Sequence, residues 1–165
     1  MGKTRVVIIG SGPGGYVAAI RGAQLGGEVT VIEDTEVGGT CLNRGCIPTK
    51  TLIASVEALH KVRHADEFGI EIKGEIIFSM AKMMERKDKV VGNLVKGIRA
   101  LFKSHGVNIV EGRGVILSPT EVEVTAKDGL KSTIQADKII IATGSRPAKM
   151  ALFPFDGEKV ITSDE

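Results

Sequence analysis

The chain has 165 residues, of which 42% are hydrophobic and 25% are charged, a balance typical of a globular protein with a core of its own. Its 22 basic and 20 acidic residues leave a net charge of +2, which excludes the strongly basic surface typical of nucleic-acid or anionic-membrane binding. Only 4% of the residues are aromatic, so a surface that stacks bases is not expected either.

The N-terminus does not resemble a signal peptide, because the apolar run after its basic start ends at Ile9. No stretch is apolar for long enough to cross a membrane. We therefore predict a cytoplasmic protein. Thiols stay reduced in that compartment, so neighbouring cysteines favour catalysis or metal binding over a structural disulfide.

The chain opens with the pattern of a βαβ unit. Residues 5–10, RVVIIG, are a short β-branched run that ends in glycine and predicts a buried strand. A glycine-rich turn and an alanine-rich helix follow over residues 10–26, and residues 28–33, EVTVIE, predict a second strand. Strands joined in this way lie parallel in one sheet.

The remainder predicts two helices and three further strands. We expect a helix over residues 49–68 and a long amphipathic helix over 79–106, with Ser79 as its N-cap and Gly106 as its stop. The strands are expected over residues 107–118, 121–127 and 131–144, as a small antiparallel layer that covers the sheet. No linker or repeat interrupts the pattern, so residues 1–165 are predicted to be one α/β, Rossmann-like domain with a parallel sheet, flanking helices and this β layer.

A glycine motif lies between the first strand and the first helix. Residues 10–15, GSGPGG, match G-x-G-x-x-G, and Glu33 follows at the end of the second strand, close to the usual spacing of about 20 residues. The first glycine permits the tight turn, the second lets the backbone approach a pyrophosphate, and the third lets helix and strand pack closely. The helix N-terminus offers N–H groups to phosphates, and Glu33 can accept hydrogen bonds from ribose hydroxyls. The carboxylate argues against NADP, whereas NAD and FAD both remain possible.

Cys41 and Cys46 are the two cysteines of the chain, within the stretch GGTCLNRGCIPTK. A structural zinc needs four ligands. His60 and His64 share a helix face but lie far along the chain, so we predict exposed polar positions for them and no metal site. A structural disulfide would close a very small loop, so its gain in stability would be small.

A redox-active cysteine pair has a geometric argument in its favour. Residues five apart in a regular helix are separated by a rise of about 7.5 Å, whereas disulfide-bonded Cα atoms lie about 5.5–6 Å apart, so pairing requires a break in the helix. Gly45 supplies a flexible joint and Pro48 favours a helix start. Cys46 then lies near a helix N-terminus, where a thiolate is stabilised, and Lys50 lies one turn further on.

Three motifs together resemble one family. GGTCLNRGCIPTK is similar to the redox-active disulfide motif of the flavin-dependent pyridine nucleotide–disulfide oxidoreductases. IIGSGPGGYVAAIRGAQLG with VTVIE resembles their FAD-binding motif, and KIIIATGSRP resembles their second flavin motif. Within the family, Leu42, Asn43, Ile47 and Pro48 are most similar to dihydrolipoamide dehydrogenases.

The resemblance implies a role for each matching residue. The FAD pyrophosphate would lie on the turn of Gly10, Gly12, Pro13, Gly14 and Gly15, with the adenosine ribose at Glu33. The remainder of the FAD site would include Gly39, Thr40, Gly114, Thr143, Gly144 and Ser145. Cys46 would be the sulfur nearest the flavin, Cys41 the thiol that exchanges with substrate, and Lys50 a residue near the flavin N5.

The resemblance also implies a longer chain. Family members continue into an NAD-binding domain and an interface domain, which supplies a His–Glu pair to the partner subunit of a homodimer. We therefore interpret residues 1–165 as the N-terminal FAD-binding part, inactive by itself. The whole enzyme would oxidise dihydrolipoamide, on a lipoyl-bearing protein or as a small dithiol, and reduce NAD⁺.

Other interpretations stay open at this point. The chain could belong to a glutathione, mercuric or related disulfide reductase. It could be a stand-alone nucleotide-binding module, or a flavin-free exchanger that uses Cys41 and Cys46 alone.

Overall fold

Two sheets form the body of the protein in a computed structural model that describes residues 2–164. The first is a four-stranded parallel sheet in the order β3-β2-β1-β7, and the second is a three-stranded antiparallel sheet in the order β4-β5-β6. The strands are β1 (Arg5–Ile9), β2 (Glu28–Glu33), β3 (Asn108–Glu111), β4 (Arg113–Ser118), β5 (Glu121–Thr125), β6 (Lys131–Gln135) and β7 (Lys138–Ile141).

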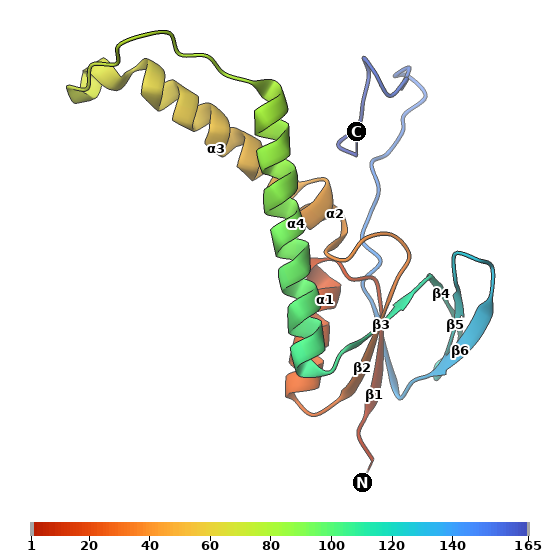
Figure 1. Cartoon of the computed structure of the whole chain (residues 1–165). Coiled ribbons are helices and arrows are strands. Elements are labelled where there is room, and N and C mark those ends of the chain that lie inside the picture. The colour runs from red at the N-terminus through yellow and green to blue at the C-terminus, as the bar shows by residue number, and fades with distance from the viewer. Residues whose placement is uncertain (1, 165) are drawn as a thin grey trace.

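The helices lie on one face of the parallel sheet and the antiparallel sheet lies on the other (Figure 1). The helices are α1 (Pro13–Gln24), α2 (Gly39–Asn43), α3 (Cys46–Arg63), the short 3₁₀ helix η1 (Ala65–Phe68) and α4 (Met80–His105). The C-terminal half of α4 covers the sheet beside α1, whereas its N-terminal half and α3 extend beyond the body as a helical arm. The predicted α/β fold, with a parallel sheet, flanking helices and a small antiparallel layer, is confirmed.

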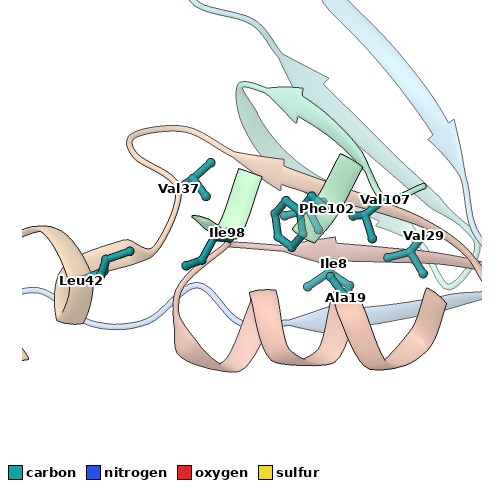
Figure 2. Packing of buried hydrophobic residues seen from close by; sticks show 9 residues of the cluster. Ile8, Ala19, Val29, Val37, Leu42, Ile98, Phe102 and Val107 are labelled. Atoms are coloured by element: carbon teal, nitrogen blue, oxygen red, sulfur yellow. The ribbon is translucent and has the colours of Figure 1, made fainter. Parts of the chain in front are cut away.

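The helix-facing core is built by alternate residues of the central strands. Ile8 of β1 points toward the helices, and Figure 2 shows it beside Ala19 of α1 and the ring of Phe102 from α4. All three are essentially inaccessible to solvent. Val29 and Val31 of β2 belong to the same cluster. The C-terminal half of α4 is therefore fixed to the sheet by Phe102 together with Ile98 of the same helix.

The opposite face of the same strands is equally apolar. Val7 and Ile9 of β1 pack against Val122 and Val124 of the antiparallel sheet, with Ala136 at the edge of the cluster. Because both faces are covered, the strand RVVII shows a continuous apolar run instead of an alternation with polar residues.

The three strands predicted after residue 107 are wrong in number, because the structure divides that part of the chain into five. The stretch 107–118 breaks at Gly112, whose φ of +153° and close approach to the Thr125 carbonyl suit glycine alone. The stretch 131–144 breaks at residues 136–137. β3 and β7 consequently join the parallel sheet, and only β4, β5 and β6 form the antiparallel layer.

The predicted helices are confirmed with shifted ends. The helix predicted over residues 49–68 is α3, which begins at Cys46, three residues earlier than expected, because Pro48 fits within a first helical turn. Its regular part ends at Arg63. Ser79 caps α4 by accepting a hydrogen bond from the Lys82 N–H, and Gly106 ends α4 in the left-handed conformation. Among the described residues, no helix is long and apolar enough to cross a membrane.

An ion pair joins the starts of the two neighbouring strands β1 and β7. Both carboxylate oxygens of Asp137 accept hydrogen bonds from Arg5: Oδ1 from the guanidinium at 2.8 Å, and Oδ2 from the backbone N–H at 2.8 Å. These side-chain and backbone hydrogen bonds lower the pKa of Asp137 to about 2.

We expect Phe102→Ala to lower the free energy of unfolding by about 3–5 kcal/mol, because it leaves a cavity between α4, α1 and the sheet. The matched control is Phe68→Ala at the exposed end of η1, where the side chain is 71% exposed and the change should stay within about 0.5 kcal/mol. Denaturant unfolding of both variants measures the difference. Equal losses would show that α4 does not depend on this contact.

Asp137→Asn should lower the melting temperature at neutral pH and not at about pH 2. A carboxylate with a lowered folded-state pKa contributes stability above its unfolded pKa, and the contribution disappears as the pH falls through the folded value of about 2. Thermal unfolding of the wild type and the variant between pH 2 and pH 7 tests this. A gap in melting temperature that stays constant over that range would contradict the ion pair.

Candidate functional site

The turn between β1 and α1 leaves no room for a side chain at Gly10 or Gly15. Gly10 has a φ of +97°, and its N–H donates to the Ile32 carbonyl at 2.8 Å. A Cβ on Gly15 would overlap the Gly10 carbonyl oxygen. Pro13 is the first residue of α1, where its missing N–H costs nothing. The turn therefore presents its backbone N–H groups at the carboxyl end of the sheet, where ligands of such folds bind.

A second glycine pair approaches this turn. Gly38 and Gly39 have φ values of +102° and +61°, and the Gly38 N–H donates to the Ser11 carbonyl at 3.1 Å. A Cβ on Gly39 would lie 2.7 Å from the Cα of Gly12. The start of α2 thus contacts the β1–α1 turn through backbone atoms alone, which holds the cysteine-bearing segment beside it.

Glu33 ends β2 and is a buried residue, 8% exposed to solvent. Oε2 accepts hydrogen bonds from the N–H and hydroxyl of Ser11, at 2.8 and 2.5 Å. Oε1 accepts from the N–H and hydroxyl of Thr35, both at 2.9 Å. Burial raises the pKa of Glu33, but these hydrogen bonds outweigh burial and hold the pKa below its usual value. The side chain is therefore a fixed, ionised acceptor.

Cys41 and Cys46 are bonded as a disulfide, with their Cα atoms 4.7 Å apart. Cys41 lies in α2 and Cys46 is the first residue of α3, so the expected helix break lies between them at Arg44 and Gly45. The amide of Asn43 donates to the Val37 and Gly39 carbonyls, which ties the end of α2 to its start and to the turn before it. The predicted position of Cys46 at a helix N-terminus is confirmed.

These features border one cleft of about 1180 Å³ at the carboxyl ends of the parallel strands. Small-molecule pockets usually measure roughly 300–1,000 Å³, so this cleft is large enough for a ligand of dinucleotide size. The structure brings together there most of the residues predicted from the sequence: Gly10, Gly12, Pro13, Gly14, Glu33, Gly39, Thr40, Cys41, Cys46, Gly114, Thr143, Gly144 and Ser145. Gly15 does not line the cleft, because it packs behind the turn. Lys50 is exposed on α3 and does not line it either.

Comparison with known proteins gives the family. The sequence model of the pyridine nucleotide-disulphide oxidoreductases matches residues 4–165. The chain belongs to this family. It is 47% identical to the dihydrolipoyl dehydrogenase of Chlamydia trachomatis over 92% of its own length and 32% of the relative's. It is 43% identical to a dihydrolipoyl dehydrogenase of Bacillus subtilis over 97% of its own length and 35% of the relative's.

A solved structure, that of LpdA from Mycobacterium tuberculosis, superposes with a TM-score of 0.85 at 30% identity, over 98% of this chain and 36% of the other. The chain thus spans about a third of the length of the relatives that it matches. The family and the resemblance to dihydrolipoamide dehydrogenases predicted from the motifs are confirmed, and so are FAD and NAD as the cofactors of the family.

The cleft of this family member fits FAD by its own geometry. Gly10, Gly12 and Gly14 line the cleft. A turn without side chains at these positions lets a pyrophosphate approach the backbone N–H groups. The disulfide and the glycine turn line the same cleft. Which of these residues contact FAD stays a prediction.

Several residues that line the cleft were missed from the sequence. They are Ser11, Thr35, Arg44, Arg113 and Arg146. Ser11 occupies a variable position of the glycine motif. The three arginines are exposed or partly exposed: Arg44 lies in a turn, Arg113 begins β4, and Arg146 follows β7. Arg44, from which the sequence allowed no inference, forms an ion pair with Glu36 at 3.0 Å.

The two histidines considered as metal ligands, His60 near the end of α3 and His64 just after it, stack on one another with ring centroids 4.1 Å apart. Across residues 2–164 there is no group of three or more His, Cys, Asp or Glu that could hold a metal ion.

Gly15→Ala should lower the free energy of unfolding by about 1–3 kcal/mol, because its Cβ would overlap the Gly10 carbonyl and displace the turn. The matched control is Gly14→Ala, one residue earlier, where the Cβ would lie 3.8 Å from the Ala142 side chain, an ordinary contact. That variant should be neutral or more stable by about 0.5–1 kcal/mol, since alanine is favoured within a helix. Denaturant unfolding compares the two. If both variants change the free energy of unfolding equally, the close packing of Gly15 on Gly10 does not determine the conformation of the β1–α1 turn.

Proposed function

We propose that this chain is the FAD-binding part of a dihydrolipoyl dehydrogenase, a dithiol-oxidising enzyme of its family. The observation that carries the proposal is a bonded cysteine pair that lines the same cleft as a dinucleotide-binding glycine turn. The identity of 43–47% to dihydrolipoyl dehydrogenases supports this substrate class over other disulfide reductases.

The proposed reaction is thiol–disulfide exchange at the cysteine pair. A thiolate of dihydrolipoamide attacks Cys41 Sγ, the Cys41–Cys46 bond breaks, and Cys46 leaves as a thiolate. The second thiol of the substrate then attacks the mixed disulfide, which closes the lipoamide ring and releases Cys41. Two electrons have moved from the substrate to the cysteine pair, and one proton accompanies the released Cys41 thiol.

The position of Cys46 suits it to be the leaving thiolate. It is the first residue of the 18-residue helix α3, where the helix dipole and free N–H groups stabilise a negative sulfur. Both cysteines line the cleft. Lys50, one turn along α3, is proposed to add positive charge to this end of the helix.

The other residues of the cleft are proposed to bind and orient the cofactor. The backbone of Gly10–Gly15 would hold the pyrophosphate, Glu33 the adenosine ribose, and Gly114 the adenine. Thr40, Thr143, Gly144 and Ser145 would contact the remainder. FAD, when bound, accepts the electron pair from the cysteines and passes it to NAD⁺.

The relatives are about three times as long as this chain, so further functions are proposed for the whole protein alone. These are NAD binding, a homodimer, reaction with a lipoyl-bearing partner, and a cytoplasmic location. Residues 1–165 by themselves are proposed to be inactive in turnover.

Reduction of the FAD-loaded protein with dihydrolipoamide should produce a long-wavelength absorbance, because the Cys46 thiolate then faces the flavin. Cys46→Ser should abolish this absorbance. The matched variant Cys41→Ser should show it without any reductant, because Cys46 is then free of the disulfide. Absorption spectra of the three proteins measure this. Full absorbance in Cys46→Ser would reverse the roles of the two cysteines, and a protein that takes up no FAD would favour a flavin-free exchanger.

A further inference from the structure

The carboxylate of Glu33 already holds as many hydrogen bonds as it can accept. A carboxylate offers about four lone-pair positions, two on each oxygen. All four are used by donors of this chain, two from Ser11 and two from Thr35. A ligand hydroxyl can therefore bond fully to Glu33 only if it takes the place of one of these donors.

Two of the four donors cannot leave. The backbone N–H groups of Ser11 and Thr35 are fixed by the fold. Ser11 lies in the β1–α1 turn, where its carbonyl also accepts from the Gly38 N–H, and Thr35 lies two residues after the end of β2. The two hydroxyls can leave, because each turns about a single side-chain bond.

The two hydroxyls differ in strength and access. Ser11 is completely buried, and its hydroxyl lies 2.5 Å from Oε2, within the range of a strong, charge-assisted O–H···O⁻ bond. Thr35 is exposed to solvent, and its hydroxyl lies at the longer distance of 2.9 Å from Oε1. A ligand that enters the cleft can replace the Thr35 hydroxyl far more easily than the Ser11 hydroxyl.

We propose that the Thr35 hydroxyl is an exchangeable donor, whose place on Glu33 Oε1 is taken by a ribose hydroxyl of the bound dinucleotide. Ser11 is a positioning residue that holds Oε2 throughout, so that the carboxylate keeps its charge and orientation during the exchange. This inference rests on the proposed nucleotide site, and it assigns the selection of a ribose with free hydroxyls to Thr35 and Ser11 together with Glu33.

The two hydroxyls then have opposite effects on binding. Without the Thr35 hydroxyl, a ribose hydroxyl no longer competes with a donor of the protein, so binding becomes tighter. Without the Ser11 hydroxyl, the buried oxygen loses a donor that neither ligand nor solvent can replace, so Glu33 is held less firmly and its pKa rises. The ionised acceptor is then lost at a higher pH as the solution is acidified.

The test uses ADP and its 2′,3′-dideoxy analogue, titrated calorimetrically into the wild type, Thr35→Val and Ser11→Ala between pH 4 and pH 7. We expect Thr35→Val to raise the preference for ADP over the analogue by about 2- to 10-fold, the worth of one hydrogen bond. Ser11→Ala should lower the preference for ADP. On acidification, this preference should also be lost at a higher pH than in the wild type. Thr35→Ser keeps the hydroxyl and is the control that should match the wild type, and circular dichroism confirms that each variant is folded.

Each other result is decisive. A lower or unchanged ADP preference in Thr35→Val means that the Thr35 hydroxyl is not exchanged and overturns the inference. If Ser11→Ala raises the ADP preference as much as Thr35→Val does, the distinction between the Thr35 hydroxyl on Oε1 and the Ser11 hydroxyl on Oε2 is overturned. If Ser11→Ala does not fold, Thr35→Val against Thr35→Ser decides the exchange alone. If the wild type binds neither ADP nor FAD, the proposed function itself fails. The unexpected results for Thr35→Val and Ser11→Ala described above would leave the proposed function intact.

Discussion

The contact on which the site depends is backbone against backbone, where β1, α1 and α2 meet. Gly15 packs on the Gly10 carbonyl, and Gly12 on Gly39, with no side chain between them. This packing places the N-terminus of α1 against the end of the sheet and the cysteine-bearing segment against both. The large cleft and the disulfide at its wall depend on the same contact, because a Cβ at Gly15 or Gly39 would push the elements apart.

Packing on both faces of the parallel sheet supports this contact. Ile8 faces the helices while Val7 and Ile9 face the antiparallel sheet, so the strand that carries Gly10 is enclosed on both sides. Because β1 is enclosed, the position of its last residue is fixed, and so is the orientation of the glycine turn that follows. The carboxylate of Glu33 is fixed as well, because Glu33 is the last residue of β2 and accepts hydrogen bonds from Ser11 and Thr35.

Sequence patterns predicted the features that are local. The apolar strand, the glycine motif, the caps at Ser79 and Gly106 and the break at Gly45 each depend on neighbours within a few residues. The division of residues 107–118 was not predicted, because it depends on Gly112 meeting Thr125 across the second sheet. The donors of Glu33 were also missed, since Ser11 lies 22 residues from Glu33 and its motif position is variable.

The pairing of β7 with β1 has a consequence for the order of assembly. The ion pair that joins these strands links residues 132 positions apart, Arg5 and Asp137, and closing so long a loop is slow compared with forming helices or hairpins. One wall of the cleft, residues 142–146, follows β7 directly. During synthesis, therefore, the glycine turn and the cysteine pair emerge early but remain without a complete binding site until residues 142–146 have left the ribosome.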